Sequence, residues 1–75
     1  MPFNPREVRA EMVANVLAIS VEVGTDVNAG DQLVLLESMK MEIPVIAEVA
    51  GQVSEVAVEV GDVISAGDLI IRLKD

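Results

Sequence analysis

The feature that most constrains the fold is an internal repeat with an offset of 37 residues. Residues 10–37 align with residues 47–74 without a gap, and eleven of the 28 positions are identical. Roughly two or three identities would arise by chance in so biased a composition. The identical pairs are Ala10/Ala47, Glu11/Glu48, Val16/Val53, Val21/Val58, Glu22/Glu59, Val23/Val60, Gly24/Gly61, Ala29/Ala66, Gly30/Gly67, Asp31/Asp68 and Leu36/Leu73. Two copies are too few for a solenoid, so the repeat predicts two halves related by a pseudo-twofold axis.

Each half has the pattern of β-strands. Apolar and polar residues alternate over 19–23 and again over 56–60, a period of two that is typical of a strand with one buried face. Residues 8–17 could be read as a short helix, but the counterpart of this segment, 47–54, contains Gly51. Helical periodicity does not persist for three turns anywhere in the chain, so we predict no helix.

Four glycines lie at equivalent positions of the repeat. Gly24 and Gly61 are expected to end the alternating strands, and Gly30 and Gly67 follow six residues later. Glycine at such places usually supplies a positive φ in a tight turn. We therefore predict a strand, a bent loop and a second strand in each half, with the glycines shaping turns rather than binding a ligand.

These elements predict an all-β fold, a flattened β-barrel or sandwich of two antiparallel sheets around a core of Val, Ile, Leu and Ala. The 75 residues allow one domain, 1–75. Within it we assign the repeat halves to 10–37 and 47–74, and a connecting hairpin to 38–46.

Composition excludes several functions. Thirteen acidic and five basic residues give a net charge of −8, which argues against nucleic acid or an anionic membrane as a partner. The chain contains no His, Cys, Tyr or Trp, so it lacks a neutral-pH base, a thiol nucleophile and soft metal ligands. We predict neither catalysis nor a metal site. The absence of cysteine, and of an apolar core of a signal peptide in residues 1–7, fits a cytoplasmic protein.

Lys40 is the candidate functional residue. It is the only basic residue between Arg9 and Arg72, an interval that contains eleven acidic residues. It lies in the segment that neither half of the repeat duplicates, where strands at 33–37 and 43–47 predict a hairpin with its tip at Met39-Lys40. Two-residue hairpin turns favour Asn-Gly or Asp-Gly, so this departure indicates a side chain displayed for use.

Simpler interpretations of the hairpin remain open. A lone lysine is most often a solvated charge, and methionines such as Met39 and Met41 are more often core filler than recognition elements. Glu37 and Glu42 could form ion pairs with Lys40 across the turn, which would contribute only a fraction of a kcal/mol.

The hexapeptide Glu37-Ser38-Met39-Lys40-Met41-Glu42 resembles the attachment motif of biotinyl domains, usually Glu-Ala-Met-Lys-Met. The glycines and aspartates of the repeat resemble the same family, so the similarity extends over residues 8–74. It implies a barrel-sandwich hybrid with the modified lysine at one end and the termini at the other. It also implies covalent biotin on Lys40, attached by a biotin protein ligase that recognises Glu37, Ser38, Met39, Met41 and Glu42.

Two departures from the family refine this resemblance. The gap-free alignment from Gly24 to Gly30 leaves no room for the protruding thumb of some carboxyl carriers, so the chain is most similar to the thumbless carriers, including small stand-alone biotin/lipoyl attachment proteins of bacteria. Ser38 replaces the common alanine, a change between two small residues that we expect to be tolerated.

The resemblance implies a monomeric, non-catalytic carrier whose biotin takes a carboxyl group from biotin carboxylase to carboxyltransferase subunits. A lipoyl or dual-cofactor carrier is the first alternative, although Met39 and Met41 favour biotin over lipoate. A cofactor-free interaction module of the same fold, docking a partner through its acidic surface and hairpin tip, is the second.

Overall fold

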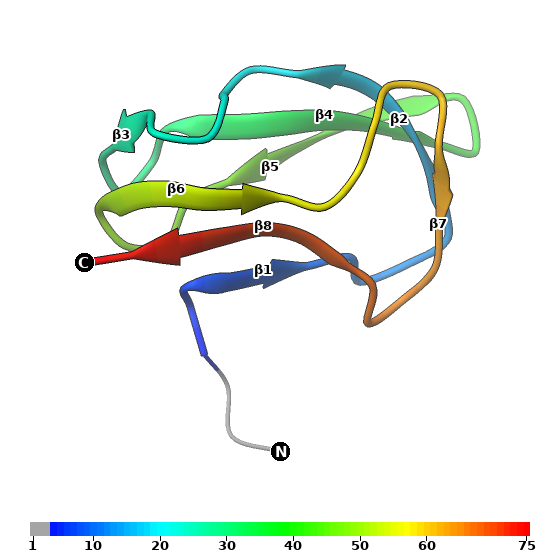
Figure 1. Cartoon of the computed structure of the whole chain (residues 1–75). Helices are drawn as coiled ribbons and strands as arrows, with labels where there is room; N and C mark the ends of the chain where they lie inside the picture. Colours follow the sequence, from blue (N-terminus) through cyan, green and yellow to red (C-terminus); the bar gives the residue numbers. More distant parts are fainter. Residues whose placement is uncertain (1–3) are drawn as a thin grey trace.

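Two four-stranded antiparallel sheets face each other across an aliphatic core in the computed structural model, which describes residues 4–75 (Figure 1). Residues 1–3, which include part of the segment judged not to be a signal peptide, lie outside the described residues. The strands are β1 (Glu7–Arg9), β2 (Ala14–Ile19), β3 (Asp26–Val27), β4 (Gln32–Ser38), β5 (Met41–Ile46), β6 (Gly51–Val56), β7 (Val63–Ile64) and β8 (Leu69–Lys74). Residues 4–75 contain no helix, and the all-β prediction is confirmed.

The strand order shows how the halves combine. One sheet has the order β1-β8-β6-β3 and the other β5-β4-β2-β7. The offset of 37 residues relates β2 to β6, β3 to β7, β4 to β8 and β5 to β1. The short strands β3 and β7 each pair with a long strand of the opposite half, so each sheet is completed by the other half.

The pseudo-twofold axis is visible in the backbone hydrogen bonds. Gly24 N donates to Val53 O and Gly61 N donates to Val16 O, both at 2.8 Å. Ala10 N donates to Asp68 O and Ala47 N donates to Asp31 O, both at 2.9 Å. All four bonds connect one half to the other. These four amides find their acceptors in the other half, so the two halves stabilise each other.

The core consists of fifteen buried aliphatic residues, and residues 4–75 contain no buried polar or charged residue. The largest fully buried side chains form three equivalent pairs: Leu33 with Ile70 and Val34 with Ile71 from β4 and β8, and Val16 with Val53 from β2 and β6. The prediction of a core made of Val, Ile, Leu and Ala is confirmed.

The loops around residues 20–31 and 57–68 depart from the prediction. The alternating strands end at Ile19 and Val56, not at Gly24 and Gly61. Val21 and Val58 are buried, but Val23 and Val60 are 64% and 63% exposed. The cause is a tight turn: Thr25 N donates to Glu22 O, while Glu22 N donates back to Thr25 Oγ1, both at 3.0 Å.

The bent loop also contains a strand that the sequence did not indicate. In each half, two residues after the turn form β3 or β7 and cross to the sheet of the other half. Gly24, Gly30, Gly61 and Gly67 have φ values of 96°, 97°, 97° and 93°. At Gly24 an added Cβ would meet no atom within 4 Å, so backbone conformation alone requires glycine there.

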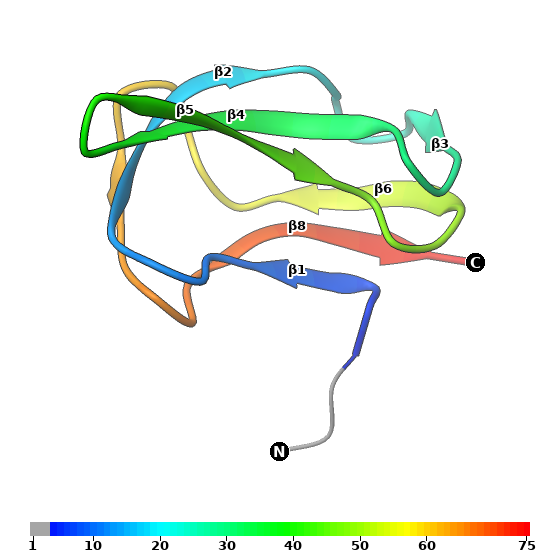
Figure 2. The same ribbon diagram turned by 180° about the vertical axis from the view of Figure 1, so that it is seen from behind.

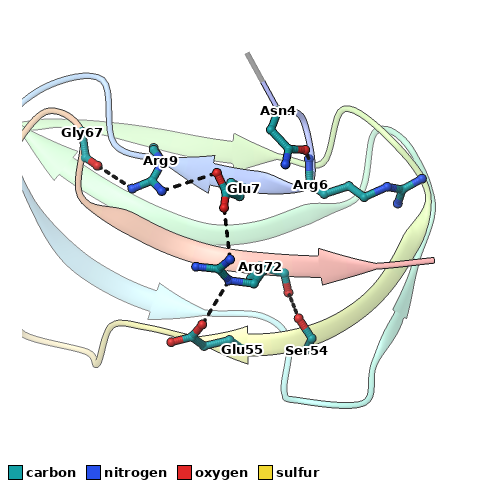
Figure 3. Close-up of polar contacts among 8 residues, drawn as sticks. All are labelled: Asn4, Arg6, Glu7, Arg9, Ser54, Glu55, Gly67 and Arg72. Atoms are coloured by element: carbon teal, nitrogen blue, oxygen red, sulfur yellow. Dashed lines mark hydrogen bonds and ion pairs between the residues drawn. The ribbon is translucent and has the colours of Figure 1, made fainter. Parts of the chain in front are cut away.

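Arg9 and Arg72 form ion pairs across β1, β8 and β6 (Figure 3). Arg72 pairs with Glu7 at 3.0 Å and with Glu55 at 3.2 Å, and Arg9 pairs with Glu7 at 3.5 Å. Arg6 pairs with Asp75 at 2.7 Å. The ends of the described chain therefore lie together, at the end of the sandwich opposite the β4–β5 turn (Figure 2).

Candidate functional site

The β4–β5 hairpin places Lys40 at a two-residue turn. Ser38 and Met41 form the last cross-strand pair, and Met39 and Lys40 have φ values of 53° and 65°. Two successive residues with positive φ are the mark of a type I′ hairpin turn, which normally contains Asn-Gly. The structure therefore places Met39 and Lys40 at the tip where the sequence expects them, in a conformation that costs non-glycine residues of order 1 kcal/mol each.

The amine of Lys40 is solvent-exposed and makes no ion pair among residues 4–75. All three arginines, in contrast, form ion pairs with carboxylates. The pairing of Lys40 with Glu37 or Glu42 that the sequence left open is not formed. Met39 is 91% exposed and Met41 62% exposed, so neither methionine fills the core. The ammonium group is thus accessible from solvent and flanked by exposed thioethers.

Glu37 and Glu42 lie directly opposite each other on β4 and β5. Like charges in this position repel each other and destabilise a hairpin by a few tenths of a kcal/mol or more. Glu37 is half-buried and Glu42 is exposed. The two carboxylates therefore give the base of the turn a negative charge that a basic partner surface would relieve.

Ser38 connects the turn to the rest of the molecule. Its Oγ donates to the backbone carbonyl oxygen of Val13 at 3.0 Å, across 25 residues of sequence. Val13 belongs to the connection between β1 and β2, and the side chains of Met12 and Val13 are 43% and 62% exposed. A surface hollow joins these residues to the hairpin, lined by residues 12–15 and 37–40.

Met12 and Val13 were not singled out by sequence reasoning. Their apolar side chains match the character of Val49 and Ala50 in the repeat, which indicates only that the position is apolar. Their exposure next to Lys40 depends on the tertiary arrangement of the β1–β2 connection. The four turn glycines, in contrast, do not line this hollow.

The site offers one reactive group. Among residues 4–75, no group of three His, Cys, Asp or Glu side chains could hold a metal ion, and no helix is long and apolar enough to cross a membrane. The exposed primary amine on a fixed turn fits a covalently attached group, because an acylating enzyme must reach the nitrogen from outside. The residues present thus suit a tethered cofactor rather than one enclosed in a pocket.

Comparison with known proteins gives a family match that covers most of the chain. Residues 6–73 match a model of the biotin/lipoyl type that is described as "Biotin-requiring enzyme". Among curated relatives, "Biotinylated protein TB7.3" of Mycobacterium tuberculosis is 67% identical over 41 residues, which are 55% of this chain and 58% of that protein. The chain thus matches little more than half the length of this relative.

Two solved structures have the same fold. The urea carboxylase of Kluyveromyces lactis superposes with a TM-score of 0.86 and 30% identity, covering 99% of this chain and 6% of that one. A single-chain, multi-domain long-chain acyl-CoA carboxylase superposes with a TM-score of 0.82 and 32% identity, covering 100% of this chain and 8% of that one. In each case the whole sandwich corresponds to a small part of a carboxylase.

Proposed function

Because the chain belongs to the biotin/lipoyl attachment family, we propose that Lys40 is the residue that carries its covalent biotin. The observation that supports this assignment most directly is the geometry of the β4–β5 turn. Lys40 lies at the second position of a positive-φ turn, exposed and without an ion pair among residues 4–75. Lys74, the other lysine of the chain, is at the end of β8 near the Arg6–Asp75 ion pair.

Attachment is an acyl transfer to nitrogen. The Nζ of Lys40 loses a proton to the ligase or to solvent, attacks the carboxyl carbon of activated biotin and expels the activating group, leaving an amide. The amide removes the positive charge of Lys40. The hairpin contributes an accessible nucleophile on a fixed turn, and the chemistry of activation belongs to the biotin protein ligase.

The attached biotin supplies a ureido nitrogen that accepts and donates a carboxyl group. This chain contributes the attachment lysine on a defined turn and no catalytic group of its own, as a carrier does. A cofactor tethered at an exposed turn has a high effective concentration at each enzyme that the carrier contacts. Biotin carboxylase and carboxyltransferase components are the proposed partners, supported by the two carboxylase structures that share the fold.

The ligase is proposed to recognise Glu37, Ser38, Met39, Met41 and Glu42, the residues that surround Lys40 on the turn. The exposed methionines and the facing carboxylates support this assignment. The four turn glycines have a structural role. A monomeric state is supported by the sheet edges: β5 contains Pro44 and β1 has three residues, features that discourage pairing with a second sheet. A cytoplasmic location is proposed from the absence of cysteine.

The test is the intact mass of the protein after incubation with an active biotin protein ligase, biotin and ATP. Wild type is expected to gain the mass of one amide-linked biotin. Lys40→Arg is expected to gain none, because a guanidinium is not an acyl acceptor under these conditions. Lys74→Arg is the matched control, with the second lysine of the chain removed, and should be modified like wild type.

Four outcomes would contradict the proposal. An unmodified wild type would exclude biotin attachment, and modification of Lys40→Arg would place the biotin elsewhere. Protein recovered from its own cells with unmodified Lys40 would favour a cofactor-free interaction module. Detection of lipoate instead of biotin on Lys40 would identify a lipoyl carrier on the same turn.

A further inference from the structure

One hydrogen bond joins residues 11–13, in the connection between β1 and β2, to the β4–β5 turn. Residues 11–13 make no backbone hydrogen bond within the described chain. Their only hydrogen bond there is the one that Val13 O accepts from Ser38 Oγ, at 3.0 Å. It is also the only side-chain hydrogen bond of residues 37–42 within that range. Within residues 4–75, the Ser38 hydroxyl therefore makes the only hydrogen bond between residues 11–13 and the β4–β5 turn.

The pseudo-twofold axis provides an internal comparison. The residue equivalent to Val13 is Ala50, and its carbonyl oxygen accepts a hydrogen bond from Arg6 Nη1 at 3.1 Å. The residue equivalent to Ser38 is Asp75, which forms an ion pair with that same arginine. The carbonyl oxygen at this position therefore accepts a side-chain hydrogen bond in both halves, from donors that are not equivalent in the repeat. The end that carries Lys40 uses a compact neutral hydroxyl, and the opposite end uses a charged guanidinium.

The hydroxyl leaves the apolar side chains of the segment uncovered. Met12 and Val13 are exposed, and they line one side of the hollow whose other side is formed by Ser38, Met39 and Lys40. This surface lies beside the turn, so an enzyme that binds around the Lys40 nitrogen can contact it. Apolar area removed from water on contact contributes about 25 cal/mol per Å², so Met12 and Val13 add binding surface that the hairpin alone does not have.

We propose that the enzyme that acylates Lys40 recognises a two-part surface, the 38–41 turn together with Met12-Val13, and that Ser38 is the positioning residue that holds the two parts together. This inference rests on the proposed function of Lys40. It assigns to Ser38, in place of the alanine common in the family, a role in affinity for the acylating enzyme. The partner surface is apolar where it covers Met12 and Val13 and basic where it meets Glu37 and Glu42.

The test is the steady-state kinetics of biotinylation, with the carrier as the varied substrate. Ser38→Ala is expected to raise KM about fivefold, the equivalent of one net hydrogen bond, with kcat within about twofold of wild type. Ser38→Thr keeps the hydroxyl on a residue that suits a strand and is expected to restore KM. Val13→Thr keeps the shape of the side chain but replaces a methyl group by a hydroxyl, and is expected to raise KM as well.

Arg6→Ala is the matched control, because it removes the equivalent hydrogen bond at the opposite end of the sandwich. It is expected to lower the unfolding temperature and to leave KM unchanged. Equal KM values for wild type and Ser38→Ala would overturn the inference, and so would an equal rise in Arg6→Ala, which would indicate a general structural effect. If wild type itself is not acylated, the proposed function fails; if it is acylated and Ser38→Ala matches it, only the role of Ser38 fails.

Discussion

Met39 and Lys40 adopt a backbone conformation that side chains rarely take. Their φ values of 53° and 65° would suit Asn-Gly, and a Cβ in this region crowds the carbonyl oxygen. The hairpin is therefore formed against the local preference of its tip, by the six cross-strand pairs between β4 and β5. The conformation fixes the backbone of Lys40 at the tip of the hairpin, where its side chain is exposed.

Met39→Gly is expected to raise the free energy of unfolding by about 1 kcal/mol, because glycine adopts positive φ without the Cβ contact. Urea denaturation followed by far-UV circular dichroism measures the change. Met41→Gly, at the first residue of β5, is the control and should lower stability by a similar amount. A loss of stability in Met39→Gly would show that the turn is not strained.

At the scale of strands, β6 and β8 approach each other unusually closely at Gly51. A Cβ added there would lie 2.8 Å from the carbonyl oxygen of Lys74 and 3.4 Å from Leu73 Cβ. Gly51 is therefore required by the spacing of two strands, whereas Gly24 is required by its φ of 96°. The same residue type serves two different physical needs in one chain.

Gly51→Ala is expected to destabilise the protein by about 2 kcal/mol or more, because backbone must move to relieve the contact. Gly24→Ala should cost about 1 kcal/mol, since the added methyl group meets open space and only the backbone is strained. Thermal and urea unfolding of the two variants give the comparison. If Gly51→Ala proved the milder change, the close approach of β6 and β8 would be contradicted.

At the scale of the whole molecule, we expect the two halves to unfold as one cooperative unit. Backbone hydrogen bonds run from each half to the other, and the buried pairs Leu33/Ile70 and Val34/Ile71 lie in one core. Residues of both halves therefore lose their partners when either half opens. The repeat in the sequence does not correspond to two units that fold separately.

Leu33→Ala and Ile70→Ala are expected to lower the free energy of unfolding by similar amounts, each about 2–5 kcal/mol. Each variant should unfold in one transition. Amide hydrogen exchange that reports on both β2 and β6 would detect any half that opened alone. Two transitions, or protection lost in only the mutated half, would contradict the cooperative description.

The sequence predicted the features that a local pattern encodes, either the internal repeat or a short motif. The alternation of residues indicated strands, the repeat indicated the pseudo-twofold axis, and the unduplicated segment indicated the hairpin at Met39-Lys40. The predicted ends of the strands were wrong because the turn at 22–25 depends on a hydrogen bond that the Thr25 side chain accepts from Glu22 N. The crossing of β3 to the other sheet and the bond from Ser38 to Val13 depend on residues far apart in the chain, and alternation carries no information about them.

The reciprocal hydrogen bonds between the halves have an evolutionary consequence. Two identical half-length chains, related by an exact twofold axis, could form the bonds that Gly24 and Gly61 now form within one chain. Duplication and fusion of such a gene would need one new connection. That connection would be the 38–41 turn. The equivalent place at the opposite end of the sandwich is where Arg6 and Asp75 form their ion pair. Lys40 would then lie in the segment that connected the two fused copies.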